Sequence, residues 1–149
     1  MGNAWRRDDG VGLVVARRLR GTLPAGVDVL ELEGEPTSLI EAWEGADRVW
    51  IVDAVASGSE AGTLHRVDAT DVALPAELFR TSTSTHHVGL AETVELARAL
   101  GRLPERIVVY GIEGARFDVG DELTPAVDVA ARQAADALRE EVAACTSER

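Results

Sequence analysis

In four short stretches of the chain, the pattern of apolar residues is typical of β-strands. Residues 48–54 and 107–112 are mostly apolar and β-branched, as in strands that are buried on both faces of a sheet. Residues 27–32 alternate apolar and acidic side chains, and residues 62–67 show a shorter alternation. The pattern predicts four strands, and the two apolar stretches are expected to be central in the sheet.

Four other stretches carry apolar residues at the three- and four-residue spacing of an amphipathic helix. Capping residues, glycines and prolines mark where these helices begin and end. The helices are expected from Asp8 or Asp9 to Gly21, from Thr37 or Ser38 to Trp43, over residues 90–100, and from the Thr124-Pro125 pair to about residue 144.

Strands that alternate with helices predict crossover connections and a mostly parallel sheet. We therefore expect an α/β fold of three layers, with helices on both faces of the sheet. A chain of 149 residues is long enough to form a single domain over residues 1–149. Residues 145–149 are expected to be a frayed tail.

Composition excludes several classes of function. The chain has 26 acidic and 15 basic residues and a net charge of −11, which argues against nucleic acid or an anionic membrane as a partner. Cys145 is the single cysteine, so no disulfide can form within the chain and a reducing compartment fits best. The start of the chain shows no signal-peptide pattern, so the protein is expected to be cytoplasmic. It is also expected to be a monomer.

Three polar side chains fall where predicted elements meet. Asp9 lies at the start of the first helix, Asp53 at the end of an apolar strand, and His86 in a Ser/Thr-rich loop before the third helix. The ends of strands in a doubly wound sheet share one edge, so these groups can converge. Two carboxylates and an imidazole suit a divalent ion such as Zn, Ni, Mn or Fe. Without a metal, the same three could act as general acid and base.

Structural explanations remain open for each of these groups. Asp8 and Asp9 are both favourable at a helix N-terminus, where they can simply cap it. Asp53 can form an Asx turn into the loop that follows its strand. Adjacent residues do not comfortably face one cleft, so either His86 or His87 is expected to be a bystander. His65 is predicted to point to solvent from an outer strand and to carry no chemistry.

Several blocks together resemble the [NiFe]-hydrogenase maturation endopeptidases. They come in that family's order and span nearly the whole chain. The blocks are Gly2-Asn3, Asp8-Asp9-Gly10-Val11-Gly12, Val52-Asp53-Ala54, Ser84-Thr85-His86-His87-Val88-Gly89-Leu90, Tyr110-Gly111-Ile112-Glu113 and Leu123-Thr124-Pro125-Ala126-Val127.

This resemblance implies a fold, an activity and a site. The fold is a doubly wound α/β domain similar to small phosphorylase- or hydrolase-like proteins. The activity is removal of a C-terminal extension from the hydrogenase large-subunit precursor after nickel insertion. The implied catalytic and metal-contacting residues are Asp9, Asp53 and His86, with His86 preferred over His87 because it keeps the spacing to Gly89. The nickel is expected to arrive with the precursor, and another divalent metal is an alternative.

The chain departs from the family's pattern in three places. Asp9 stands where the family commonly has Glu, so its shorter stem can shift the metal or leave room for another water. The loop at residues 33–37 differs from the family's Gly-Gly-Thr-like sequence, and this loop is expected to help select the partner. The family's chains also carry an apolar strand before Gly2-Asn3, so the resemblance implies that about one strand is missing before Gly2.

Two other functions fit the same residues. A non-catalytic assembly factor could check for nickel by binding the precursor without cutting it. A small-molecule hydrolase on the same fold is a further alternative, although the sequence has no glycine-rich loop of the kind that cradles phosphate.

Overall fold

The computed structural model describes residues 1–79 and 88–148. Within these residues lies a three-stranded sheet in the order β1-β3-β2. The strands are β1 (Arg48–Val55), β2 (Leu64–Asp68) and β3 (Arg106–Glu113). β1 runs parallel to β3, with Asp53 opposite Gly111, and β2 runs antiparallel to β3.

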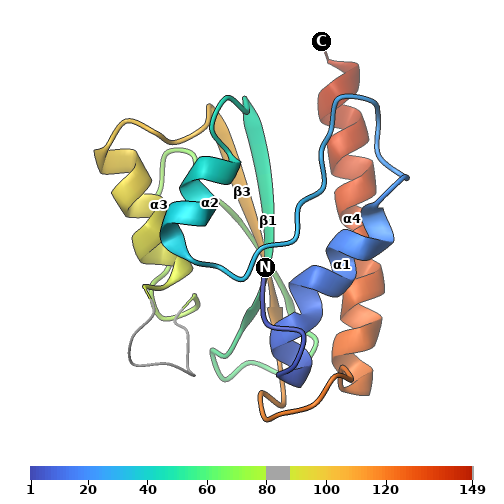
Figure 1. The fold of residues 1–149 in the computed structure, drawn as a ribbon. Helices are drawn as coiled ribbons and strands as arrows, with labels where there is room; N and C mark the ends of the chain where they lie inside the picture. The colour runs from blue at the N-terminus through green and yellow to red at the C-terminus, as the bar shows by residue number, and fades with distance from the viewer. Residues whose placement is uncertain (80–87, 149) are drawn as a thin grey trace.

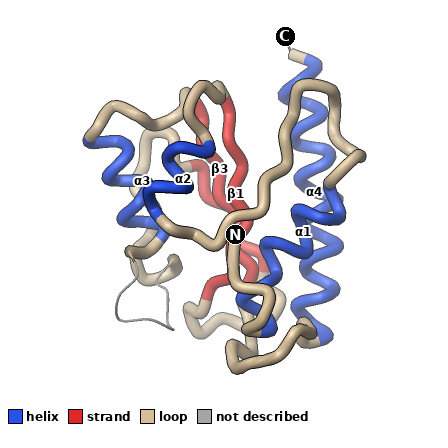
Figure 2. Tube along the Cα trace, in the orientation of Figure 1, coloured by secondary structure: helices blue, strands red, loops and turns tan. Residues whose placement is uncertain are grey.

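Helices cover both faces of this sheet, which gives the expected three-layer α/β arrangement (Figure 1). α1 and α4 lie on one face, whereas α2 and α3 lie on the other, as the coloured elements in Figure 2 also show. None of the helices in the described part of the chain has the length and hydrophobicity of a membrane-spanning segment. The helical elements are a 3₁₀ turn η1 (Arg7–Gly10), α1 (Val11–Leu19), α2 (Pro36–Ala42), α3 (Leu90–Ala99) and α4 (Pro125–Ser147).

Two apolar clusters pack against the two faces of the sheet. Alternate residues of a strand point to opposite faces, so Val108 and Ile112 meet α1 and α4, while Ile107 and Val109 meet α2 and α3. All four side chains are fully buried. β3 is therefore the central strand, as its continuous apolar run predicts.

One carboxylate on α4 joins the helix to all three strands. Glu141 accepts hydrogen bonds from Trp50 Nε1 in β1 at 3.2 Å, from the guanidinium of Arg66 in β2 at 2.6 and 3.1 Å, and from the Tyr110 hydroxyl in β3. Bonding to Arg66 and to Tyr110 holds the pKa of Glu141 below its usual value, although partial burial alone would raise it. The bonds fix the long helix over the sheet.

Several boundaries and one strand differ from the sequence-based expectations. Residues 27–32 are extended but form no strand, because no neighbouring strand lies beside them among the described residues to share backbone hydrogen bonds. For the same reason β1 is an edge strand of the described sheet, although its apolar run predicted a central one. The sheet is also mixed, since β2 is antiparallel to β3.

Two helix ends also differ. Glu35, and neither Thr37 nor Ser38, caps α2: its side chain accepts from the N–H groups of both residues, at 3.1 and 2.8 Å. α4 continues to Ser147, so the predicted frayed tail is helical as far as that residue. Cys145 is buried within it, and its carbonyl accepts a hydrogen bond from the Arg48 guanidinium at 2.7 Å.

Candidate functional site

Met1 and Gly2 lie between β1 and the turn that carries Asp8 and Asp9. The Met1 amino group donates to Val52 O at 2.7 Å, directly before Asp53 in the strand. Gly2 has a positive φ of 140°, and a side chain at this position would overlap the carbonyl oxygen of Asp9. The first two residues thus run in close contact with both β1 and η1, which brings Asp9 toward Asp53.

Asp53 projects from β1 two residues before the strand ends. Its Oδ1 accepts from the N–H of Ala54 at 2.9 Å, which fixes the side chain against its own backbone. Burial raises the pKa of Asp53 to about 6. The charge of Asp9 raises this pKa further, while the Met1 ammonium opposes both effects.

Asp9 belongs to η1, the single turn that precedes α1. Its Oδ2 accepts from the N–H of Asn3 at 3.1 Å, in the loop before the turn. Neither η1 nor α1 has a side-chain cap, so the explanation of Asp9 as a helix cap is wrong. Burial raises the pKa of Asp9 above its usual value, against the lowering effects of the Asn3 amide and the Arg6 guanidinium. Two carboxylates with raised pKa values thus share one site.

Asp8, the neighbour of Asp9, is fully buried, and its hydrogen bonds go to the loop between β3 and α4. Its carboxylate accepts from the N–H groups of Ala115, Arg116 and Thr124 at 2.8 to 2.9 Å, and also from the Thr124 hydroxyl. Asp8 therefore anchors η1 to the loop that joins β3 to α4. The backbone supports this link, since Arg7 N donates to Gly120 O at 2.8 Å.

A second buried carboxylate lies at the end of β3. Glu113 is 1% exposed and accepts from the N–H groups of Ser57 and Gly58 at 2.7 and 3.0 Å, and from the Ser57 hydroxyl at 2.7 Å. His65 Nε2 lies 3.3 Å from Glu113 Oε2 and its side chain is 21% exposed, so the prediction that His65 points to solvent is wrong. This cluster fixes the loop after β1.

The structure brings two of the three predicted site residues together. His86 and its neighbour His87 lie in the segment 80–87, outside the described residues. Among the residues that are described, no three His, Cys, Asp or Glu side chains gather closely enough to hold a metal ion. The pair Asp9 and Asp53 does fit part of a divalent-ion site, because a cation between them would offset their repulsion and the cost of burying their charges.

Sequence reasoning missed the Met1 amino group as part of this site. This amino group lies beside both carboxylates, and burial lowers its pKa even though Asp53 and Asp9 each raise it. No sequence pattern points to such a contact. The role of Asp8 was also missed, although its pairing with Thr124 joins two of the blocks that the sequence singles out.

Replacing Gly12 by Ala is expected to disturb the site through the backbone. An added Cβ would overlap the carbonyl oxygens of Met1 and Val52, and these atoms cannot move without separating α1 from β1. We expect Gly12→Ala to reduce the free energy of unfolding by about 1–3 kcal/mol, as for other overpacked positions. Urea unfolding would measure this, with Arg18→Ala, an exposed position of the same helix, as control. Equal stability of both variants would contradict the tight contact.

Comparison with known proteins identifies the family. The fold and the acidic pair define an α/β protein with a polar site where the N-terminal turn meets β1. A family described as hydrogenase maturation protease matches residues 14–141. The chain belongs to the hydrogenase maturation protease family.

Individual relatives agree with this assignment. The chain is 31% identical over 130 residues to the hydrogenase expression/formation protein HupD of Rhodobacter capsulatus, covering 85% of this chain and 61% of that protein. It is 29% identical over 147 residues to the hydrogenase 2 maturation protease of Escherichia coli, covering 94% and 88% of the two chains.

The solved structure of the hydrogenase maturating endopeptidase HybD from E. coli is similar in fold. It has a TM-score of 0.74 and 26% identity, over 94% of this chain and 89% of that one. The chain spans about three fifths of the length of the HupD proteins from R. capsulatus and Thiocapsa roseopersicina.

Proposed function

We propose that this protein is a processing endopeptidase that removes a C-terminal extension from a [NiFe]-hydrogenase large-subunit precursor after nickel insertion. The observation that carries the proposal is the pair Asp9 and Asp53 where η1 meets β1, because burial raises the pKa values of both carboxylates above their usual range. Family membership supplies the substrate class, because related proteins are described as hydrogenase maturation proteases.

Nickel would arrive as part of the substrate. On docking, the precursor's metal would meet Asp9 and Asp53 from this chain, and His86 would supply an imidazole. Carboxylate and imidazole groups are ligands that a divalent ion accepts, and this ion would reduce the repulsion between the two half-buried carboxylates. The site would therefore favour a nickel-loaded precursor over an empty one. Cytoplasmic action in a reducing compartment fits a chain whose single thiol, Cys145, is free and buried.

The carboxylates can also assist peptide-bond hydrolysis. A group whose pKa is about 6 is mostly ionised at neutral pH and still accepts a proton from water, which suits a general base. A divalent ion at the same place polarises the scissile carbonyl or lowers the pKa of a bound water. In both schemes Asp53, held by the Ala54 amide, keeps its orientation without any help from the substrate.

The two histidines before α3 provide a direct test of the proposed ligand set. His86→Ala is expected to abolish removal of the C-terminal peptide, because it deletes the imidazole that would contact the metal. His87→Ala is expected to leave most of the activity. Intact mass of the precursor after incubation with each variant measures both effects. An equal loss in the two variants would contradict the assignment of His86.

A non-catalytic assembly factor is the second candidate. The observation that favours it is the short stem of Asp9, whose carboxylate is already bonded to the Asn3 amide. Such a protein would bind the nickel-loaded precursor through the same residues and release it uncut. A stable complex with an uncleaved precursor would identify this function.

A further inference from the structure

The two most exposed large apolar side chains of the described residues belong to neighbouring segments. Val119 is 83% exposed and Trp5 is 73% exposed. Arg6 and Gly120 form an isolated parallel β-bridge, in which the Gly120 N–H donates to Trp5 O at 2.9 Å. The residues that precede two bridge partners are neighbours in a parallel register, so Trp5 lies next to Val119. The bridge thus brings together two solvent-exposed apolar side chains from distant parts of the chain.

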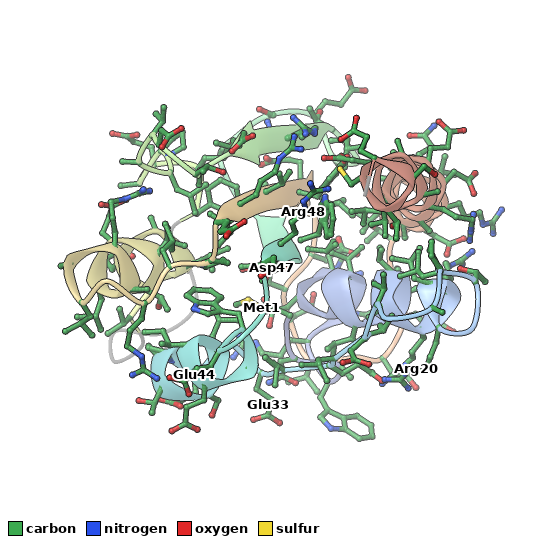
Figure 3. All side chains as sticks on the ribbon, turned by 90° about the horizontal axis from the view of Figure 1, so that it is seen from above. Met1, Arg20, Glu33, Glu44, Asp47 and Arg48 are labelled. Atoms are coloured by element: carbon green, nitrogen blue, oxygen red, sulfur yellow. The ribbon has the colours of Figure 1, made fainter. Side chains whose placement is uncertain are left out.

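This apolar pair lies at the edge of the sheet that carries the acidic site. Figure 1 shows the start of α1 and the loop before α4 at the lower edge, where β1 and β3 end. Figure 3 looks onto the opposite edge, where Asp47 and Arg48 begin β1. The Trp5 N–H donates to Asn3 Oδ1 at 3.0 Å, and the Asn3 N–H donates to Asp9 Oδ2 at 3.1 Å. Asn3 therefore links Trp5 to a carboxylate of the site.

The backbone that carries Trp5 is held in place on both sides of the bridge. Arg7 has a φ of 48° and is the one residue other than glycine with a positive φ in the described part of the chain. Such a strained conformation persists only where the surrounding contacts enforce it. The Arg7 N–H donates to Gly120 O at 2.8 Å, and the buried carboxylate of Asp8 anchors the next residue to the loop before α4. Trp5 is therefore exposed on a fixed segment.

Arg6 places a positive charge beside the apolar pair. Its Nε–H donates to Phe117 O at 3.1 Å. Arg7 forms an ion pair with Asp118, whereas Arg6 forms none with the residues that the structure describes. The two outer nitrogens of the Arg6 guanidinium can therefore bind a carboxylate of a partner in the forked geometry that arginine favours. Burial raises the pKa of Asp9 and the charge of Arg6 opposes this effect, so the guanidinium lies close to the site.

We propose that Trp5, Val119 and Arg6 form a docking surface for the segment of the precursor next to the bond that is cut. This segment would place an apolar side chain against Trp5 and Val119 and a carboxylate on Arg6. The chain has a net charge of −11, so it repels an acidic partner in general, including a second copy of itself, whereas the Arg6 guanidinium attracts a carboxylate at this place. The inference rests on the proposed function, because it describes how that substrate is held.

The test measures cleavage and binding of the nickel-loaded precursor separately. The surface variants are Trp5→Ala, Arg6→Ala and Val119→Asp, and each is compared with the parent protein for kcat and KM. The Kd of each complex is measured in an Asp53→Asn background, which keeps the precursor uncut. We expect KM and Kd to rise by about tenfold or more, as for an aromatic or arginine side chain at the centre of an interface. The value of kcat should change little, because docking contributes equally before and during the reaction.

Matched controls remove exposed side chains of the same kinds at the far ends of two helices. Leu100→Ala lies at the end of α3 and Arg20→Ala at the end of α1, and both side chains are more than half exposed. Both controls should keep the KM and Kd of the parent. Surface variants with the same KM and Kd as these controls would overturn the proposal. A fall in kcat at unchanged KM would also overturn it, since Arg6 would then act through Asp9 and not through docking.

The docking surface and the proposed function fail in different ways. Cleavage by the parent that none of the surface variants weakens contradicts the docking surface and leaves the endopeptidase in place. Binding without cleavage, weakened by the surface variants, supports the docking surface and contradicts the endopeptidase. A precursor that does not bind the parent at all contradicts the docking surface as well.

Discussion

Asp53→Asn is expected to abolish precursor processing while leaving the protein folded. Asn keeps the shape of the side chain and can still accept from the Ala54 amide through its oxygen, so the local geometry is preserved. It cannot carry the negative charge that would contact a metal or accept a proton from water. Because general-base assistance is worth about 10²–10⁴-fold, the rate of peptide release should fall by at least that range. Timed assays with intact mass would measure it.

Stability distinguishes this effect from unfolding. The folded-state pKa of Asp53 is raised to about 6. A raised pKa contributes stability that is fully present below the usual value near 3.8 and is lost as the pH rises through about 6. At pH 7 the charge of the half-buried Asp53 is therefore unfavourable, and the neutral variant should be at least as stable as the parent. Asp121→Asn, an exposed change of the same charge, is the control for activity. Full activity of Asp53→Asn would contradict the assigned role.

Asp8→Asn is expected to cause the largest loss of stability among single substitutions at the site. One carboxylate oxygen of Asp8 accepts from Thr124 N–H, and the other accepts from Ala115 and Arg116 N–H. An Asn amide presents donors on one side, so one or two buried N–H groups lose their acceptor. Each such group costs about 1–3 kcal/mol, so we expect a loss of about 2–4 kcal/mol in the free energy of unfolding.

Urea unfolding would measure this loss, provided that the dependence of the free energy of unfolding on urea concentration is the same in both proteins. Asp118→Asn is the matched control, since it removes the same charge from the same loop but at an exposed position. Its ion pairs with Arg7 and Arg116 are exposed, so its unfolding midpoint should stay close to that of the parent. Similar midpoints for Asp8→Asn and the parent would contradict the anchoring role of Asp8.

The fold could be predicted from the sequence where local patterns and packing agree. The apolar run at β3 and the Thr124-Pro125 start of α4 each specify one structure and were placed correctly. Residues 27–32 carry an equally clear strand pattern but form no strand, since pairing depends on a neighbour and not on the segment itself. The antiparallel β2 was missed because alternation in a strand does not report its direction.

The place of the acidic pair at one edge of the sheet was predictable from the sequence. The roles of Asp8 and His65 were not. Asp9 and Asp53 follow from element ends that share one edge of the sheet, a relation that the fold class fixes. Asp8 and Asp9 are chemically identical neighbours, and only the tertiary contact with Thr124 makes one an anchor and leaves the other in the site. The bond of His65 to Glu113 also depends on tertiary placement, because β2 reverses direction beside β3.

Processing of the cognate large-subunit precursor, with and without inserted nickel, is the measurement that tests the central claim most directly. The protein would be incubated with each form and the precursor followed by intact mass, with Asp53→Asn in parallel. We expect a discrete C-terminal peptide to be lost only from the nickel-loaded precursor and only with the parent protein. A complex that forms with nickel-loaded precursor while its mass stays unchanged would contradict the endopeptidase and identify an assembly factor.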